Sequence, residues 1–347
     1  MVNPIPSKLE APAPVELHDR CRCFLSMFNL KYPIIQAPTD GPATSALAIA
    51  VSNAGALGAL PLTWVSPDLA HKRVMKVRSK TAGSFFAGYV LNFPTTSLDK
   101  AIEAGIQIVQ FSWGLPDREL VRKLRDHSIK IGIQVVERES ALRALDLGPD
   151  YLVCQGIEAG GHVQGNKPLM TALEEVLSVA NDIPVAASGG IATGHQIRKY
   201  ISAGAAAAVL GSRFVATVES VAHPEYKREL VAAGAAADTV VTVCLNKDWP
   251  NATHRLLRNN TSFQMWQAAG FPPGPPRGDR PGEHDIVGWE EDGSVLERYV
   301  SNVPVTGMKR CDVNALGTYA GEGVPYINDI PPAKELVLRL WNEFQTI

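Results

Sequence analysis

Short apolar runs rich in β-branched residues alternate with longer amphipathic stretches over the first two thirds of the chain. The short runs predict buried strands, because turn residues follow them. The longer stretches predict helices, because their apolar residues recur at i, i+3 and i+4. The predicted strands are Ile34–Ala37, Leu57–Leu60, Phe85–Leu91, Gln107–Phe111, Ile131–Val135, Tyr151–Val153, Pro184–Ala187 and Ala207–Leu210, and the clearest helical patterns are Asp117–Asp126, Ser140–Leu147 and Leu169–Ala180.

This alternation predicts the fold class. Strands that follow one another through helices pair in parallel by right-handed crossovers, and eight of them close most naturally into a (β/α)8 TIM barrel. A doubly wound open sheet is the alternative. Such a barrel needs about 250 residues, whereas the eight cycles end near residue 220 of 347. The remaining residues must therefore build something besides the barrel.

The residues after the eighth strand differ in composition, so we divide the chain into a barrel domain (1–218), a smaller cap region (219–322) and a C-terminal segment (323–347). Helical patterns at Ala252–Asn259 and Phe263–Ala269 indicate a mostly helical cap region. The Pro/Gly-rich tract Phe271–Gly282 cannot continue a helix or a central strand, so we expect a loop. The amphipathic pattern after Pro331-Pro332 predicts a final helix that returns to the barrel wall.

Composition and charge narrow the class of protein. Hydrophobic residues make up 46% of the chain, which is enough for a large core. Lys and Arg number 33 against 35 Asp and Glu, so nucleic acids and anionic membranes are not expected partners. The closest cysteine pair, Cys21 and Cys23, is too close in sequence for a zinc site, so we expect no metal. Residues 1–14 lack the apolar stretch of a secretory signal, which favours a cytoplasmic protein.

Two glycine-containing loops follow the last two predicted strands. Ser188-Gly189-Gly190 follows the seventh strand and Gly211-Ser212 follows the eighth. Barrels of this class bind phosphate with the loops after strands 7 and 8 and with the N-terminus of a short helix. The glycines could instead only form tight turns. Their occurrence after both of the expected strands favours a phosphate-bearing ligand.

The loop after the sixth strand carries the candidate catalytic residue. Between Cys154 and His162, small residues surround two acid–base groups, Glu158 and His162. His162 belongs to the catalytic face of the barrel, and an imidazole with a reference pKa of about 6.5 exchanges protons near neutral pH. A lone histidine can also be structural, and Glu158 could be a helix N-terminal acid or a salt-bridge partner.

Further polar groups are expected at the barrel mouth. Ala37-Pro38-Thr39 follows the first strand, Asn92 follows the third, Gln134 lies near the end of the fifth, and Gln155 follows the sixth. Their amide and backbone groups match the hydrogen-bonding edge of a flavin. Each amide could equally be a packing residue whose hydrogen bonds are made within the protein.

Together these segments resemble the FMN-dependent nitronate monooxygenases, formerly 2-nitropropane dioxygenases, and the related enoyl-acyl-carrier-protein reductase II and NADH:quinone reductase branches. The resemblance extends from about residue 28 to 345, and its most specific part is Glu158-Ala159-Gly160-Gly161-His162. The other matching segments are Gln36-Ala37-Pro38, Asn53-Ala54-Gly55, Leu57-Gly58, Gln155-Gly156, Ser188-Gly189-Gly190-Ile191, Gly211-Ser212-Arg213-Phe214 and Tyr319-Ala320-Gly321-Glu322-Gly323.

The resemblance implies an FMN over the barrel mouth and an enzyme that oxidises alkyl nitronates or nitroalkanes with dioxygen. It implies that His162 manages the proton on the carbon beside the nitro group, while the flavin performs the redox step. The implied cofactor contacts are Gly160, Gly161, Ser188, Gly189, Gly190, Gly211 and Ser212, mostly at the phosphate end, and Ala37, Asn92, Gln134 and Gln155 nearer the ring or ribityl chain, with Pro38, Thr39 and Ala159 from the same motifs.

Three residues depart from the family pattern. Thr39 stands where many relatives have methionine, Gln134 where some have lysine, and Glu322 where glutamine is common. These departures bear on the reduction potential of the flavin and on substrate preference, which the sequence leaves open.

Two other functions remain as alternatives. An NAD(P)H-dependent reductase of quinones or enoyl thioesters would share the cofactor residues, and one that serves an acidic acyl-carrier protein should carry a basic rim. A barrel that binds FMN or another phosphate ligand without turnover is the third hypothesis. The expected partners are a small-molecule substrate and dioxygen, and apolar helical patches of the cap region could also form a homodimer. The candidate rim residues are Arg255, Arg258, Arg277 and Arg280.

Overall fold

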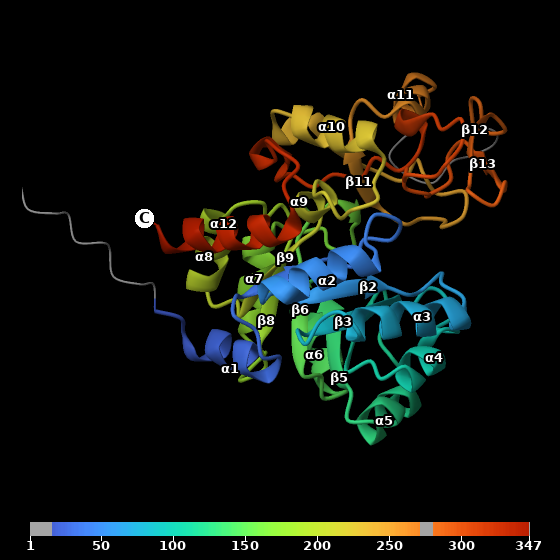
Figure 1. The fold of residues 1–347 in the computed structure, drawn as a ribbon. Coiled ribbons are helices and arrows are strands. Elements are labelled where there is room, and N and C mark those ends of the chain that lie inside the picture. The colour runs from blue at the N-terminus through green and yellow to red at the C-terminus, as the bar shows by residue number, and fades with distance from the viewer. Residues whose placement is uncertain (1–15, 271–279, 347) are drawn as a thin grey trace, which may run out of the picture.

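The structure is a computed structural model that describes residues 16–270 and 280–346. Eight parallel strands form one sheet, in the order β1-β9-β8-β6-β5-β4-β3-β2, and helices surround it (Figure 1). The predicted TIM barrel is therefore confirmed. Its strands are β1 (Ile34–Gln36), β2 (Gly58–Pro61), β3 (Phe85–Val90), β4 (Ile108–Ser112), β5 (Lys130–Val135), β6 (Tyr151–Gln155), β8 (Val185–Ser188) and β9 (Ala207–Leu210).

The barrel closes between its first two strands. The backbone N–H of Gln36 donates to Leu57 O, and the N–H of Leu57 donates to Ile34 O, both at 2.9 Å. The buried side chain of Gln36 adds two bonds of 3.2 Å to the backbone of Ala59, one donated and one accepted. The Gln36 side chain thus adds hydrogen bonds between β1 and β2, which few backbone hydrogen bonds join.

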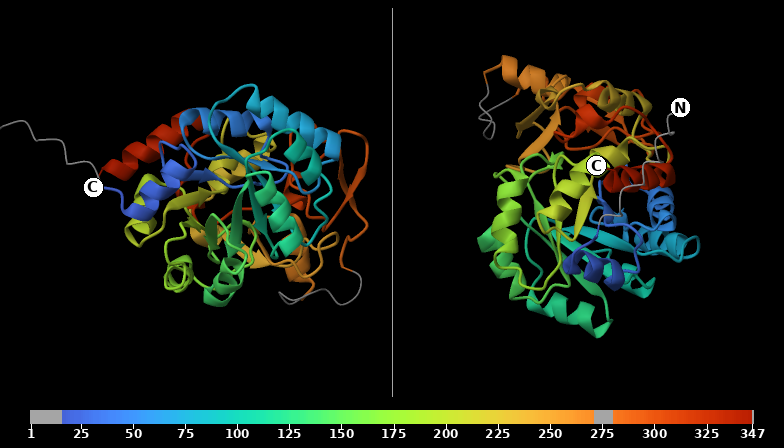
Figure 2. Two further views of the ribbon diagram at one scale, coloured as in Figure 1. Left: turned by 90° about the horizontal axis from the view of Figure 1, so that it is seen from below. Right: turned by 90° about the vertical axis from the view of Figure 1, so that its left-hand side faces the viewer.

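Amphipathic helices cover the outside of the barrel, and the three predicted helical patterns are confirmed in α5, α6 and α7. The final helix is also confirmed: α12 packs against α2 and α8 on the barrel wall, as Figure 2 shows. The helices are α1 (Asp19–Met27), α2 (Ser45–Ala54), α3 (Pro67–Arg78), α4 (Leu98–Glu103), α5 (Arg118–Asp126), α6 (Arg138–Leu145), α7 (Leu169–Leu177), α8 (Gly194–Ser202), α9 (Ser212–Val215) and α12 (Ala333–Gln345).

Side chains fill the barrel interior because alternate strand residues point inward. Ile35 and Tyr151 belong to this inner cluster. A Cβ at position 132 would lie 2.2 Å from the Tyr151 ring, so Gly132 on β5 leaves the space that the ring occupies. At the N-terminal end of the barrel, Phe24 and Phe28 contact the same ring edge to face, with centroids 5.7 and 5.4 Å away. That end is closed, which leaves the opposite end for a site.

The cap region lies over the carboxyl ends of the strands (Figure 1). It combines helices with two small antiparallel sheets, so the prediction of a mostly helical region was wrong in part. One sheet also includes β7 (Gly161–His162) from a barrel loop. The elements are α10 (Pro224–Ala232), β10 (Thr239–Thr242), β11 (His254–Leu257), α11 (Thr261–Ala268), β12 (Ile286–Trp289), β13 (Val295–Glu297) and the 3-10 turns Ala236–Asp238, Val313–Ala315 and Val324–Tyr326.

The helix predicted over Ala252–Asn259 is wrong, because these residues contain strand β11. All four residues of β11 are buried between β10 and β7, and a short apolar run of this kind does not distinguish a strand from a buried helix. The helix predicted over Phe263–Ala269 is confirmed in α11, where the Asn260 side chain accepts from the N–H of Phe263. Most of the predicted loop Phe271–Gly282 lies outside the described residues.

Across residues 16–270 and 280–346, no helix combines the length and the apolar character needed to cross a membrane.

Candidate active site

A cavity of about 510 Å³ lies between the carboxyl ends of the barrel strands and the cap region. Its volume falls in the range of about 300–1,000 Å³ that is typical of ligand and cofactor sites. Of the predicted site residues, Asn92 is exposed and does not line the cavity. The predicted residues that do line it are Ala37, Pro38, Thr39, Gln134, Gln155, Ala159, Gly160, Gly161, His162, Ser188, Gly189, Gly190, Gly211 and Ser212.

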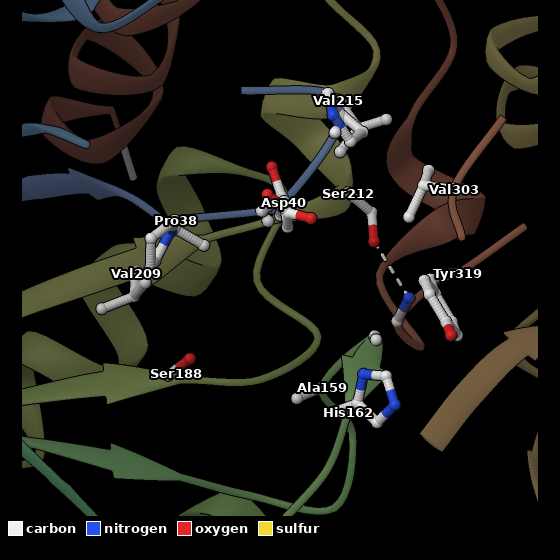
Figure 3. Close-up of a pocket in the computed structure, with 18 of the residues that line it drawn as sticks. Pro38, Asp40, Ala159, His162, Ser188, Val209, Ser212, Val215, Val303 and Tyr319 are labelled. Carbon is white, nitrogen blue, oxygen red and sulfur yellow. Dashed lines mark hydrogen bonds between the residues drawn. The ribbon is translucent and has the colours of Figure 1, made fainter. Parts of the chain in front are cut away.

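The two glycine loops form one side of this cavity. Gly189 and Gly190 have φ angles of 139° and 65°, which L-residues with side chains rarely adopt. Within the described chain, the backbone N–H groups of Gly189, Gly190 and Gly211 donate to no protein acceptor. Ser212 begins α9, and its hydroxyl faces the same cavity as Ser188 (Figure 3). The Ser212 hydroxyl accepts from the N–H of Gly321 at 3.0 Å and can still donate its own proton. Unpaired N–H groups and donor hydroxyls gathered in this way suit an anionic group such as a phosphate.

His162 reaches the cavity from β7, which pairs with β11 of the cap region. The register sets His162 opposite His254 and Gly161 opposite Arg255. The Gln155 amide holds the same loop from below, donating to His162 O at 3.2 Å and accepting from the N–H of Gln164 at 2.8 Å. The orientation of His162 therefore depends on both the barrel and the cap region.

Aromatic rings surround the imidazole of His162. Trp249 stacks on it with ring centroids 4.1 Å apart and an interplanar angle of 27°. Tyr319 and Trp113 lie 5.4 and 6.2 Å from it. Burial, together with a smaller contribution from His254, holds the pKa of His162 well below 6.5. The sequence suggested a group that titrates near neutral pH, whereas the structure makes His162 a neutral base there.

His254 is fully buried behind His162, and both of its ring nitrogens have partners. Nδ1 lies 2.9 Å from Ala252 O, so it carries the proton, and Nε2 accepts from the N–H of Leu245 at 3.3 Å. Burial lowers the pKa of His254 to about 4. The two facing histidines are therefore both neutral at pH 7.

Three polar residues that the sequence suggested as site residues form hydrogen bonds within the protein. Both amide atoms of Gln155 bond the loop, as described above, and Gln134 donates to the side chain of Gln164 at 2.7 Å. Glu158 accepts from the N–H of Leu169 at 2.9 Å and so caps the start of α7. The interpretation of Glu158 as a helix N-terminal acid is confirmed.

The candidate arginines do not form a free basic rim in the described part of the chain. Arg255 is buried, donates to Ile157 O and pairs with Glu322 at 2.8 Å. Arg280 is also buried and bonds Asn246 at 2.6 Å. Arg258 donates to the backbone oxygens of Ala237 and Thr239, and Arg277 lies outside the described residues.

Most of the aromatic residues at the site were not predicted from the sequence. Trp64, Trp113 and Trp249 line the cavity, and Tyr319 was noted only as part of a motif. A signal for two of them existed, because Trp64 and Trp113 lie within four residues after the ends of predicted strands, as Phe93 also does. Trp249 comes from the cap region, whose position over the barrel no local pattern reveals.

Comparison with known proteins identifies the family. The sequence model of the family "Nitronate monooxygenase" matches residues 22–343. The nitronate monooxygenase of Pseudomonas aeruginosa is 29% identical over an alignment that is 360 positions long with its gaps and covers 90% of this chain and 96% of that protein. The nitronate monooxygenase of Paraburkholderia phytofirmans is 30% identical over 265 residues, which cover 63% and 72%.

Solved structures agree with this assignment. FabK from Thermotoga maritima superposes with a TM-score of 0.75 at 27% identity, covering 95% of this chain and 96% of that chain. Nitroalkane oxidase from Streptomyces ansochromogenes has a TM-score of 0.71 at 24% identity over 93% and 97%, and supports the fold. The predicted FMN cofactor and oxidoreductase class are confirmed, and the chain belongs to the nitronate monooxygenase family.

Proposed function

We propose that this protein oxidises nitronates or their parent nitroalkanes with dioxygen, using FMN, with His162 as the acid–base residue. The observation that carries the proposal is the pairing of two features in one cavity. An imidazole that burial keeps unprotonated lies on one wall, and glycine N–H groups without protein acceptors lie on another. The first suits removal of a proton from carbon, and the second suits the phosphate of a flavin nucleotide.

The residues of the cavity fit FMN. The loops Ser188–Gly190 and Gly211–Ser212 would hold the phosphate, since both line the cavity and their glycine N–H groups have no acceptor in the described chain. Ala37, Pro38 and Thr39, from the loop after β1, would lie nearer the ring. When bound, FMN supplies the redox chemistry between the deprotonated substrate and dioxygen.

The protein's own part in the reaction is proton transfer. Nε2 of His162 is buried and has no hydrogen-bond partner among the described residues, which leaves Nδ1 to accept the proton from the carbon beside the nitro group. A neutral imidazole can take this proton without first losing one. The aromatic rings around His162 keep water from it, which disfavours the charged imidazolium and so keeps the free base unprotonated before the substrate binds.

The decisive experiment is anaerobic reduction of the bound flavin. We expect an alkyl nitronate or nitroalkane to bleach the flavin absorbance of the holoenzyme within the time of turnover, and readmitted dioxygen to restore it. Rapid bleaching by NADH or NADPH but not by nitronate would overturn the proposal in favour of the reductase alternative. The cytoplasmic location and the homodimer remain predictions.

A further inference from the structure

A continuous wall of aromatic rings leads from the outside of the molecule to His162. Trp249 stacks on His162 and contacts Trp113 at 4.9 Å and Phe93 at 5.1 Å between ring centroids. Trp64 contacts Phe93 at 5.0 Å and is 48% exposed, so it forms the outer end of the wall. Three of these rings come from the loops after β2, β3 and β4, and the cap region adds Trp249.

The charged residues that line the cavity are mostly acidic. Asp40, Asp248 and Glu290 line it, and Arg213 is the single lysine or arginine among the described lining residues. The charge of Arg213 is already paired, because the guanidinium is 2% exposed and Nη2 bonds the backbone and side chain of Asp329 at 3.0 Å each. A second anionic group on a substrate would therefore meet carboxylates without a cation to balance it.

We infer that the preferred substrate is a nitro compound whose carbon substituent is uncharged and apolar, and best of all aromatic. This inference rests on the proposed function and adds the part of the substrate that the reaction itself does not specify. Apolar surface placed against the aromatic wall leaves water and gains binding free energy. A carboxylate in the same position loses its hydration and is repelled by the carboxylates of Asp248 and Glu290, which also line the cavity.

Three substrates with the same reacting carbon test the inference. Each of (2-nitroethyl)benzene, 1-nitrobutane and 3-nitropropionate carries its nitro group on a CH2 that is followed by another CH2, and they differ in the end group. With the holoenzyme, we expect kcat/KM to fall about tenfold or more from the phenyl to the butyl compound. We expect a further fall of about 100-fold or more to the carboxylate. Equal or higher kcat/KM for 3-nitropropionate would overturn the inference.

Four variants locate the selectivity. Trp64→Ala should lower the phenyl-to-butyl ratio of kcat/KM several-fold, and Trp64→Phe should restore most of it. Asp248→Asn, which keeps the side-chain size, should raise the kcat/KM for 3-nitropropionate relative to that for 1-nitrobutane. The control is Leu142→Ala on α6, which removes a 42% exposed apolar side chain that does not line the cavity. Leu142→Ala should leave both ratios unchanged, and ratios that Trp64→Ala and Asp248→Asn also leave unchanged would overturn the inference.

The same measurements separate this inference from the proposed function. If the holoenzyme oxidises all three compounds with equal kcat/KM, the proposed function stands and the inference fails. If none of the compounds reduces the bound flavin under anaerobic conditions, the proposed function fails and the inference falls with it.

Discussion

At the scale of single residues, the state of His162 follows from its burial. Because its pKa lies well below 6.5, the base form is present throughout the neutral range, and kcat/KM should not vary between pH 6.5 and 8 through this group.

His162→Asn removes the base while keeping a small polar side chain. We expect turnover to fall about 100-fold or more while the flavin stays bound, as measured by oxygen uptake and flavin absorbance. Unchanged turnover would remove His162 from the mechanism.

The buried His254 should make the free energy of unfolding depend on pH. Below pH 6.5 the unfolded chain takes up a proton on this residue, whereas the folded protein does so only near pH 4. The unfolded state therefore binds more protons, and the free energy of unfolding declines as pH falls from 6.5 to 4, by up to about 3 kcal/mol. His254→Gln should flatten that decline in urea titrations. The control His284→Gln, at a side chain that is 82% exposed, should follow the wild-type decline.

At the scale of elements, the two-residue strand β7 connects the barrel loop to the cap sheet. Gly161 has a φ of 75°, and Gly148, after α6, has a φ of 63°; a Cβ at either position would have no heavy atom within 4 Å. Alanine at both positions should therefore cost a similar amount, about 1–2 kcal/mol of unfolding free energy. Gly161 lines the cavity and Gly148 does not. We therefore expect Gly161→Ala alone to weaken FMN binding, by about tenfold or more in a flavin-fluorescence titration.

A result in which both alanine variants bind FMN equally well would show that β7 does not contribute to the cofactor site. Loss of binding in both would instead point to a general loss of folded protein, which the unfolding curves would report directly.

At the scale of the whole molecule, the barrel and the cap region share one cavity, so a bound cofactor should join them. At an FMN concentration 100 times its Kd, we expect the free energy of unfolding to rise by about 2.7 kcal/mol over the apoprotein. Removal of FMN should speed amide hydrogen exchange in β7, β10 and β11 and leave β3 to β5 unchanged. Faster exchange throughout the barrel would contradict this division.

The parts of the protein predicted from sequence are those with local signals. The strands, α5 to α7, α11 and α12 each have a periodicity that a window of residues contains, and Gly189, Gly190 and Gly211 mark turns at known places in a barrel. The strand β11 was mistaken for a helix, because its buried state depends on β10 and β7. Asn92 was expected to line the cavity because it follows a predicted strand, but it is exposed.

The sequence by itself determined the barrel, the glycine loops and the location of His162 on the catalytic face, since side-chain period and turn chemistry act over a few residues. Only the tertiary structure decided the neutral state of His162, the stacking of Trp249 on it and the excess of carboxylates in the cavity. These properties depend on burial and on distances between residues far apart in the chain. Such distances are set when the cap region packs over the barrel, and no local pattern encodes them.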